Sequence, residues 1–166
     1  MEKILISRCL LGHRVRYDGG AHGPFDQLAV WQAEGRVVAL CPEVAGGLPT
    51  PRPPAEIPGG QGAQVLDGQA LVLTQAGEDV SAPFISGAQQ ALALVQQHGI
   101  RLAVLKSRSP SCGNLETYDG SFSGEKVRGQ GVTAALLSRA GVQVFNEEQL
   151  AAALEALQAL ERGRSA

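Results

Sequence analysis

Each of the three cysteines in this chain follows a short apolar run that has the pattern of a buried β-strand. Cys9 comes after residues 4–6, Cys41 after residues 37–40, and Cys112 a few residues after the run at 102–105. Short, continuous apolar runs are typical of strands covered on both faces, as in parallel sheets. The carboxyl ends of parallel strands meet at one edge, where open α/β sheets bind their ligands. We therefore expect the three thiols to converge on one site.

The order of the predicted elements indicates an α/β fold. Apolar runs predict strands at 4–6, 37–40, 102–105 and 142–145, and helical spacing predicts helices at 25–34, from Ser81 to Gly99, at 132–140 and from Asn146 onward. Alternating strands and helices favour a mainly parallel, Rossmann-like sheet with helices on both faces. The length suits one domain over residues 1–166, with a frayed tail at 162–166.

Three connecting segments are rich in proline or glycine. Residues 42–62 are dense in both, and a loop of that length inside a domain is usually functional. Residues 64–74 resemble a hairpin or edge strand that turns at Asp67-Gly68. Residues 114–131 are polar and Gly-rich and end in Gly129-Gln130-Gly131, a weak signal for an anion at the start of the next helix.

Composition excludes several classes of function. The net charge is −2 and Lys and Arg form no run, which argues against a large nucleic-acid surface but permits a single nucleobase as ligand. No apolar stretch is long enough for a transmembrane helix, and residues 1–4 lead into a strand without the apolar core of a signal peptide. We expect a cytoplasmic protein whose cysteines stay reduced, because an odd number of separated cysteines suits no disulfide framework.

The three cysteines form a soft donor set with a missing ligand. Thiolates select zinc, copper(I) or iron–sulfur clusters, and the spacing matches neither a zinc finger nor a ferredoxin run. His13 and His22 follow Cys9 and could reach the site, although a surface position is more typical; His98 suits the exposed end of a helix. A site with three protein ligands keeps a position open for substrate.

Other polar residues accompany the cysteines. Glu43 lies two residues after Cys41, where it could act as a general acid or base or simply cap a helix. Ser107, Ser109 and Ser111 precede Cys112 and could donate to a substrate atom or belong to an ordinary turn. Arg52, in the Pro-rich segment, could anchor substrate, but an exposed loop arginine is the more usual interpretation.

Four segments of the chain resemble the bacterial thiouracil desulfidase (TudS) family, long catalogued as a domain of unknown function. They are Ser7-Arg8-Cys9-Leu10-Leu11-Gly12, Val15-Arg16-Tyr17-Asp18-Gly19, the run from Cys41 to Arg52, and the run from Leu105 to Gly113. The resemblance extends over about residues 3–150, with no departure at a motif position. These segments are specific in combination.

The resemblance implies a cofactor and a reaction. The family carries an oxygen-sensitive [4Fe–4S] cluster held by three cysteines, which correspond to Cys9, Cys41 and Cys112, and the iron without a protein ligand binds the substrate's sulfur. The family's acid–base glutamate corresponds to Glu43 and its assisting serine to Ser109. The implied activity is non-redox desulfuration of a thiolated pyrimidine base, in which thiouracil and water give uracil and hydrogen sulfide.

Two other functions are compatible with the same residues. A zinc ion held by the three cysteines could serve a hydrolase or deaminase, although the Pro-Cys-x-x-Cys signature of nucleobase deaminases is absent. A non-enzymatic iron–sulfur redox sensor would need the cysteines but not Glu43. The expected partner is a small thiolated nucleobase, with no membrane and no large nucleic acid, and the pattern predicts no particular oligomeric state.

Overall fold

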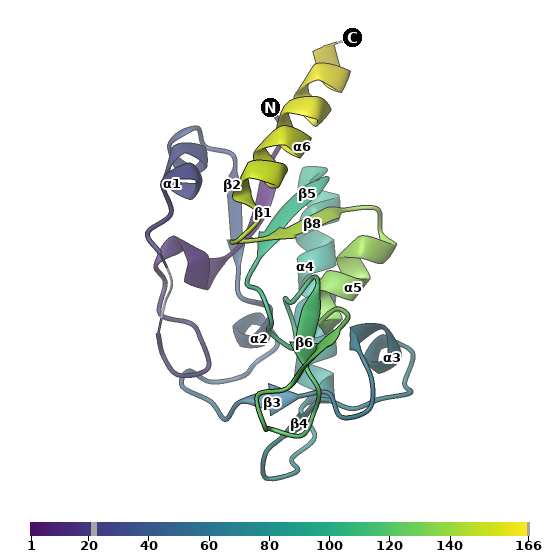
Figure 1. The fold of residues 1–166 in the computed structure, drawn as a ribbon. Coiled ribbons are helices and arrows are strands. Elements are labelled where there is room, and N and C mark those ends of the chain that lie inside the picture. Colours follow the sequence, from purple (N-terminus) through teal and green to yellow (C-terminus); the bar gives the residue numbers. More distant parts are fainter. Residues whose placement is uncertain (21–22, 166) are drawn as a thin grey trace.

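A four-stranded parallel sheet forms the centre of the computed structural model, which describes residues 1–20 and 23–165 (Figure 1). Its strands are β1 (Ile4–Ser7), β2 (Val37–Leu40), β5 (Leu102–Leu105) and β8 (Gln143–Asn146), in the order β2-β1-β5-β8. Every pairing is parallel. The predicted fold class is confirmed, and the strand order changes direction between β1 and β5, the position where open α/β sheets bind ligands.

Helices cover both faces of this sheet (Figure 1). The helices α1 (Asp26–Ala33) and α6 (Leu150–Ser165) pack on one face, against Ile4, Ile6 and Val104. The helices α4 (Ser81–His98) and α5 (Val132–Arg139) pack on the other face, against Leu5 and Leu105. Neighbouring residues of each strand thus serve different cores, as the alternation of side chains along a strand requires.

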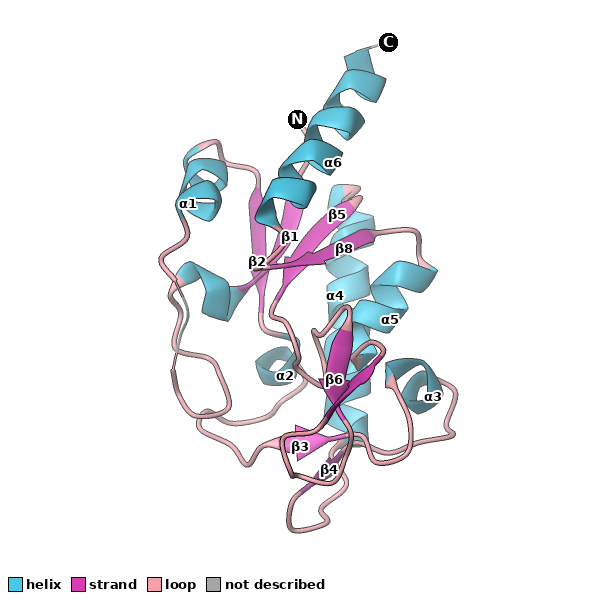
Figure 2. Cartoon of the chain, in the orientation of Figure 1, coloured by secondary structure: helices cyan, strands magenta, loops and turns pink. Residues whose placement is uncertain are grey.

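The smaller elements lie beyond the carboxyl ends of the parallel strands (Figure 2). They are the 3-10 helix η1 (Arg8–Leu11), the helices α2 (Pro42–Ala45) and α3 (Gly62–Leu66), the antiparallel pair β3 (Ala55–Glu56) with β4 (Leu73–Thr74), and the hairpin of β6 (Glu116–Tyr118) with β7 (Lys126–Arg128). Among the described residues, no helix is long and apolar enough to cross a membrane.

The hairpin predicted at residues 64–74 is wrong. Residues 62–66 form α3 instead, because Gln61 and Gln64 make a reciprocal capping box and Val65 is buried in the core beside Val132. Residues 73–74 pair with β3, which lies earlier in the chain. A local turn signal was outweighed by packing over a longer range.

The structure also differs from the prediction at the start of the last helix, and it contains a hairpin that the sequence did not predict. The last helix starts at Leu150, not Asn146, because Asn146 still pairs with Leu105 at the end of β8. The polar, Gly-rich segment 114–131, for which the sequence predicted no regular structure, contains the β6–β7 hairpin. Of the tail predicted to be frayed, residues 162–165 belong to α6, and Ala166 lies outside the described residues.

Two glycines bring α2 into direct contact with α4. A Cβ atom on Gly46 would lie 1.9 Å from the carbonyl oxygen of Pro83, and one on Gly87 would lie 1.9 Å from the carbonyl oxygen of Pro42. No real Cβ atom approaches an oxygen so closely, so both positions need glycine for backbone contact. The contact fixes α2, the helix that follows Cys41 and carries Glu43.

We predict that Gly87→Ala destabilises the protein, by about 1–3 kcal/mol, because the added methyl group must push α2 away from α4. A loss of stability would be informative, because alanine is intrinsically a better helix former than glycine by about 1 kcal/mol and helix propensity alone would stabilise the variant. Thermal or denaturant unfolding measures the effect. Gly163→Ala is the matched control: it lies in α6 with nothing near its Cβ position, and should leave stability unchanged or slightly higher. Equal effects of the two substitutions would contradict the packing argument.

Candidate active site

The three cysteines line one cavity of about 520 Å³ at the carboxyl edge of the sheet. Cys9 lies in η1 directly after β1, Cys41 precedes the first residue of α2 directly after β2, and Cys112 lies in the turn that follows β5. The strands β2, β1 and β5 are neighbours in the sheet, so their ends carry the thiols to one place. Cys9 and Cys112 are buried, and Cys41 is partly exposed. All three are free thiols.

Burial keeps the two inner thiols neutral in the protein alone. It raises the pKa of Cys9 to about 11, with a further rise from the negative charge that Cys41 would carry; Lys106 and Arg16 act in the opposite direction. Burial also raises the pKa of Cys112 strongly, against a hydrogen bond that the Ser7 hydroxyl donates to its sulfur at 3.6 Å. A bound cation would oppose this rise and favour the thiolate form, as it does for thiolate ligands in general.

Glu43 lies in the same cavity, in the first turn of α2. Its side chain is 17% exposed. One carboxylate oxygen accepts a hydrogen bond from Arg52 Nε at 3.1 Å, and the other accepts a longer one, 3.4 Å, from the Ser109 hydroxyl. A carboxylate that is partly desolvated, ionically paired and open to a cavity has the features of a general acid or base.

Ser109 links Glu43 to the turn that carries Cys112. Its Oγ accepts hydrogen bonds at 3.0 Å from the backbone N–H groups of Ser111 and Cys112 while its hydroxyl donates to Glu43. The other two serines are engaged elsewhere. Ser111 is fully buried against Thr133, and Ser107 donates to Glu147. Of the three predicted serines, Ser109 is the one whose hydroxyl bonds Glu43.

Arg52 is buried, in contrast to the exposed loop arginine expected from the sequence. Its side chain is only 4% exposed. Besides Glu43, its guanidinium donates to the carbonyl oxygens of Val15 and Pro49 and to the Thr50 hydroxyl, at 3.0–3.2 Å. Arg52 and Pro54 from this Pro-rich segment both line the cavity. The proline density was a signal of a functional segment, but no local pattern indicates that an arginine inside it is buried.

Glu147, which sequence reasoning missed, holds the segment between β5 and Cys112. Its carboxylate accepts hydrogen bonds from the backbone N–H and the hydroxyl of Ser107, at 2.7 and 2.8 Å, and pairs with Lys106 Nζ at 3.2 Å. Burial alone would raise the pKa of Glu147, but these hydrogen bonds and the Lys106 charge outweigh it, and the pKa is lowered. Glu147 directly follows the last residue of β8. Its contacts therefore join the end of that strand to Lys106 and Ser107, which line the cavity.

We predict that Glu147→Gln destabilises the protein at neutral pH by about 1–3 kcal/mol, because it weakens hydrogen bonds to a buried acceptor and removes the negative charge paired with Lys106. The folded-state pKa is below the ordinary value of 4.5. The stabilisation is therefore present above that value and is lost as the pH falls through the lower, folded-state pKa. Unfolding measured from pH 7 downward should show the difference between wild type and variant shrinking below pH 4.5.

Glu155, exposed on α6, supplies the control for that comparison. Glu155→Gln should have little effect on stability at any pH. A wild-type-to-Glu147→Gln difference that is independent of pH would contradict an ionised Glu147 in the folded protein.

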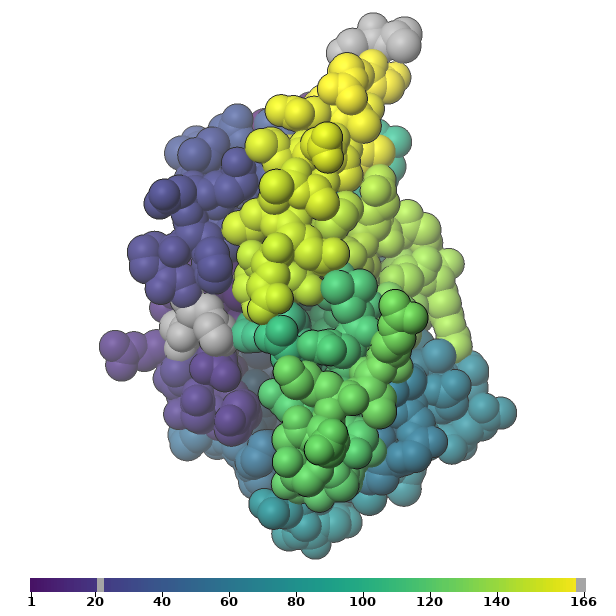
Figure 3. Space-filling model, in the orientation of Figure 1, coloured from purple at the N-terminus to yellow at the C-terminus, as the bar shows by residue number. Residues whose placement is uncertain are grey.

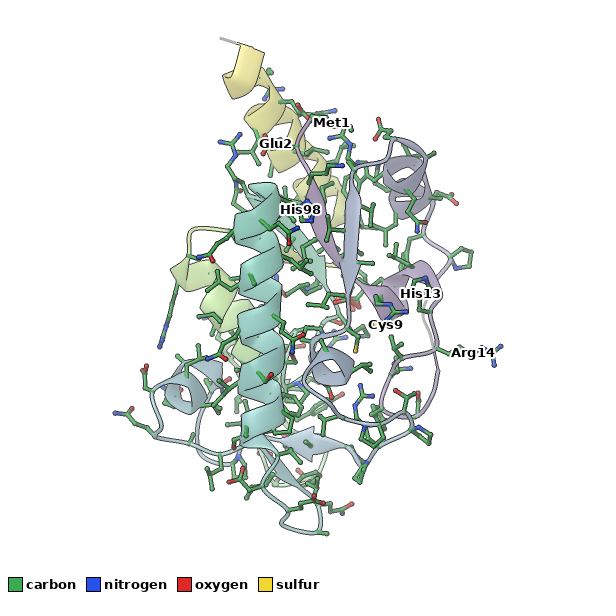
Figure 4. The ribbon with its side chains drawn as sticks, turned by 180° about the vertical axis from the view of Figure 1, so that it is seen from behind. Met1, Glu2, Cys9, His13, Arg14 and His98 are labelled. Carbon is green, nitrogen blue, oxygen red and sulfur yellow. The ribbon has the colours of Figure 1, made fainter. Side chains whose placement is uncertain are left out.

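Neither histidine among the described residues lines the cavity. The described histidines are His13 and His98; His22 lies outside the described residues. His13 is exposed and accepts a hydrogen bond from Arg8, and His98 lies at the end of α4 remote from Cys9 (Figure 4). The described chain contains no group of three or more His, Cys, Asp and Glu side chains that could hold a single metal ion as they stand.

The start of α5 is not free to bind an anion. The backbone N–H groups of residues 131–134 donate to carbonyl oxygens of Pro110, Ser111 and Gly113. The anion site considered for Gly129-Gln130-Gly131 is therefore wrong, because the turn that carries Cys112 already occupies this helix N-terminus. Gly131 has no room for a side chain, since a Cβ atom would lie 2.5 Å from the carbonyl carbon of Ser111.

The outer wall of the cavity is aromatic and cationic. It includes Tyr17 and Arg16 from the loop after η1, Tyr118 and Phe122 from the hairpin, and Arg108. Glu56 of β3 holds the hairpin's connection in place by accepting hydrogen bonds from the backbone N–H groups of Gly120 and Phe122. Figure 3 shows the purple N-terminal segment and the green hairpin on the same face of the molecule. A flat, unsaturated ring suits such a lining.

Residues 4–149 match the family model described as 2-thiouracil desulfurase. The chain belongs to the 2-thiouracil desulfurase family. The resemblance drawn from the sequence motifs is thereby confirmed. An uncharacterized Bacillus subtilis (strain 168) protein, YbbK, is 45% identical over 147 residues, a match that covers 89% of this chain and 97% of the relative.

A solved structure described as a [4Fe–4S]-dependent thiouracil desulfidase, TudS (DUF523Vcz), has the same fold. Its TM-score against this chain is 0.87, with 51% sequence identity, and the match covers 96% of this chain and 99% of that one.

Proposed function

We propose that this protein is a [4Fe–4S]-dependent desulfidase that converts a thiolated pyrimidine base such as thiouracil, with water, into uracil and hydrogen sulfide. One observation carries the proposal: three free thiols, Glu43 and Ser109 line a single cavity at the carboxyl edge of the sheet. Membership of the family and the likeness to TudS support the same activity.

The donor set fits an iron–sulfur cluster. Cys9, Cys41 and Cys112 would hold it, as soft ligands of the kind that such clusters take. Because burial raises the pKa of both Cys9 and Cys112, the bound metal would have to stabilise their thiolate forms. When bound through three cysteines, the cluster supplies a Lewis-acidic iron with an open position for the substrate's sulfur.

Glu43 is the proposed acid–base residue. Its Oε1 is held by Arg52, so Oε2 is the oxygen that can take a proton from water as the water attacks the carbon that carries sulfur. Ser109 donates to Oε2 and can orient the carboxylate and the substrate, or return a proton. Water supplies the new oxygen atom and the departing sulfur leaves as sulfide, so carbon undergoes no net redox change.

The rest of the cavity suits a nucleobase. A volume of about 520 Å³ is within the range of small-molecule sites, and the aromatic side chains of Tyr17, Tyr118 and Phe122 offer faces for stacking.

Free cysteines and the absence of a membrane-spanning helix among the described residues agree with a cytoplasmic location, which we include in the proposal.

We predict that Glu43→Gln lowers the rate of sulfide release from thiouracil by about 10²–10⁴-fold, the usual contribution of a general acid or base, while the protein still binds its cluster. The measurement is anaerobic reconstitution with iron and sulfide, followed by a sulfide-release assay and by the absorption spectrum. Glu155→Gln, far from the cavity on α6, is the control and should match wild type.

The outcomes separate the proposed function from its alternatives. A cluster-loaded wild type that releases no sulfide would rule out thiouracil as substrate. A redox sensor predicts that Glu43→Gln leaves function intact. A zinc hydrolase predicts a colourless active protein, whereas an iron–sulfur enzyme is brown.

A further inference from the structure

We propose that Arg52 is the positioning residue of this site: it acts through Glu43, fixing one carboxylate oxygen so that the other is presented to the cavity. The proposal deepens the function above and rests on it for its catalytic consequence. The pairing itself is seen in the structure, where Arg52 Nε donates to Glu43 Oε1 at 3.1 Å. The Arg52 side chain is 4% exposed and the Glu43 side chain is 17% exposed.

The protein uses most of the donors that Arg52 has. A guanidinium carries five N–H groups, one on Nε and two on each Nη. Nε donates to Glu43, Nη1 donates to the Pro49 carbonyl and the Thr50 hydroxyl, and Nη2 donates to the Val15 carbonyl. One N–H group is left over, too few for the two-pronged recognition by which arginine anchors a ligand. Arg52 is therefore built to hold protein groups and not substrate.

Arg52 also connects the segments that surround Glu43. Its backbone N–H donates to the Tyr17 carbonyl at 2.6 Å, and its Nη2 shares the Val15 carbonyl with the Cys41 thiol, whose sulfur is 3.8 Å from that oxygen. The loop after η1, the Pro-rich segment and the start of α2 thus meet at one guanidinium. Because nearly all its N–H groups are hydrogen-bonded, the guanidinium is held in one orientation. The Glu43 oxygen that it binds is held in place with it.

The two oxygens of Glu43 are held unequally. Oε1 accepts from a buried cation, whereas Oε2 accepts one long hydrogen bond, 3.4 Å, from Ser109. A carboxylate fixed at one oxygen can rotate little, and its second oxygen stays where a proton is to be moved. Catalytic groups displaced by about 1 Å lose on the order of 10²-fold in rate, so the loss of this anchor should be visible in kcat.

The test is a double-mutant cycle of Arg52→Gln and Glu43→Gln, with Arg52→Lys beside it. In cluster-loaded protein, Arg52→Gln should lower kcat for sulfide release by about 10–100-fold and change KM by less than about threefold. Arg52→Lys keeps the positive charge but lacks the planar arrangement of N–H donors. Its kcat should therefore lie between those of Arg52→Gln and wild type. In the Glu43→Gln background, Arg52→Gln should lower kcat no further.

Glu155→Gln on the exposed face of α6 is the control, because Glu155 contacts neither Arg52 nor Glu43 and does not line the cavity. It should keep the wild-type kcat. A kcat that is unchanged in Arg52→Gln, or that falls by the same factor with and without Glu43, would overturn the proposal and leave Arg52 a purely structural residue.

A second readout is independent of activity. In the cluster-free protein, the effects of Arg52→Gln and Glu43→Gln on the unfolding equilibrium constant should be non-additive by about tenfold, as expected for a contacting, partly buried pair. Additive effects would overturn the pairing. If cluster-loaded wild type released no sulfide, the proposed function would fail, while this cycle would still decide whether Arg52 holds Glu43.

Discussion

The parallel pairing of β1 with β2 on one side and with β5 on the other is the constraint on which the rest of the structure depends. It brings together three chain segments that are far apart in sequence, each followed by a cysteine. No short motif could build this site, because none of the thiols lies near another along the chain. The sheet supplies the convergence, and the glycine contact between α2 and α4 fixes the helix that follows the second thiol and carries Glu43.

The cavity combines groups that would be costly to bury alone. Two thiols are buried enough that their pKa values rise, and a carboxylate and a guanidinium are withdrawn from water beside them. The carboxylate and guanidinium compensate each other through a hydrogen-bonded pair, and the thiols stay neutral until something positive binds. The serine that bonds Glu43 also holds the turn of Cys112, so the proposed catalytic residues and the proposed ligands belong to one network.

Sequence reasoning succeeded where the signal was periodic or positional and failed where it depended on contacts at long range. The buried strands, the helix ending at Gly99 and the convergence of the cysteines follow from apolar patterning and from the geometry of parallel sheets. The hairpin predicted at 64–74 failed because Val65 is drawn into a distant core. Glu147 has no local signal, since its partners lie on another segment, and the contacts that Arg52 makes with Val15 and Glu43 join segments that are separate in sequence. Position suggested an acid–base role for Glu43, the resemblance assigned roles to Glu43 and Ser109, and both roles remain proposals.

The central claim is that Cys9, Cys41 and Cys112 together hold one cluster. The most direct measurement is the iron and sulfide content and the absorption spectrum of anaerobically reconstituted wild type beside its three single Cys→Ser variants, with Ser138→Ala on α5 as a control. The account predicts a brown wild type and control with about four iron atoms each, and a lost or strongly reduced cluster in every cysteine variant. A variant that lacks one of these thiols and still shows the wild-type spectrum and iron content would contradict it.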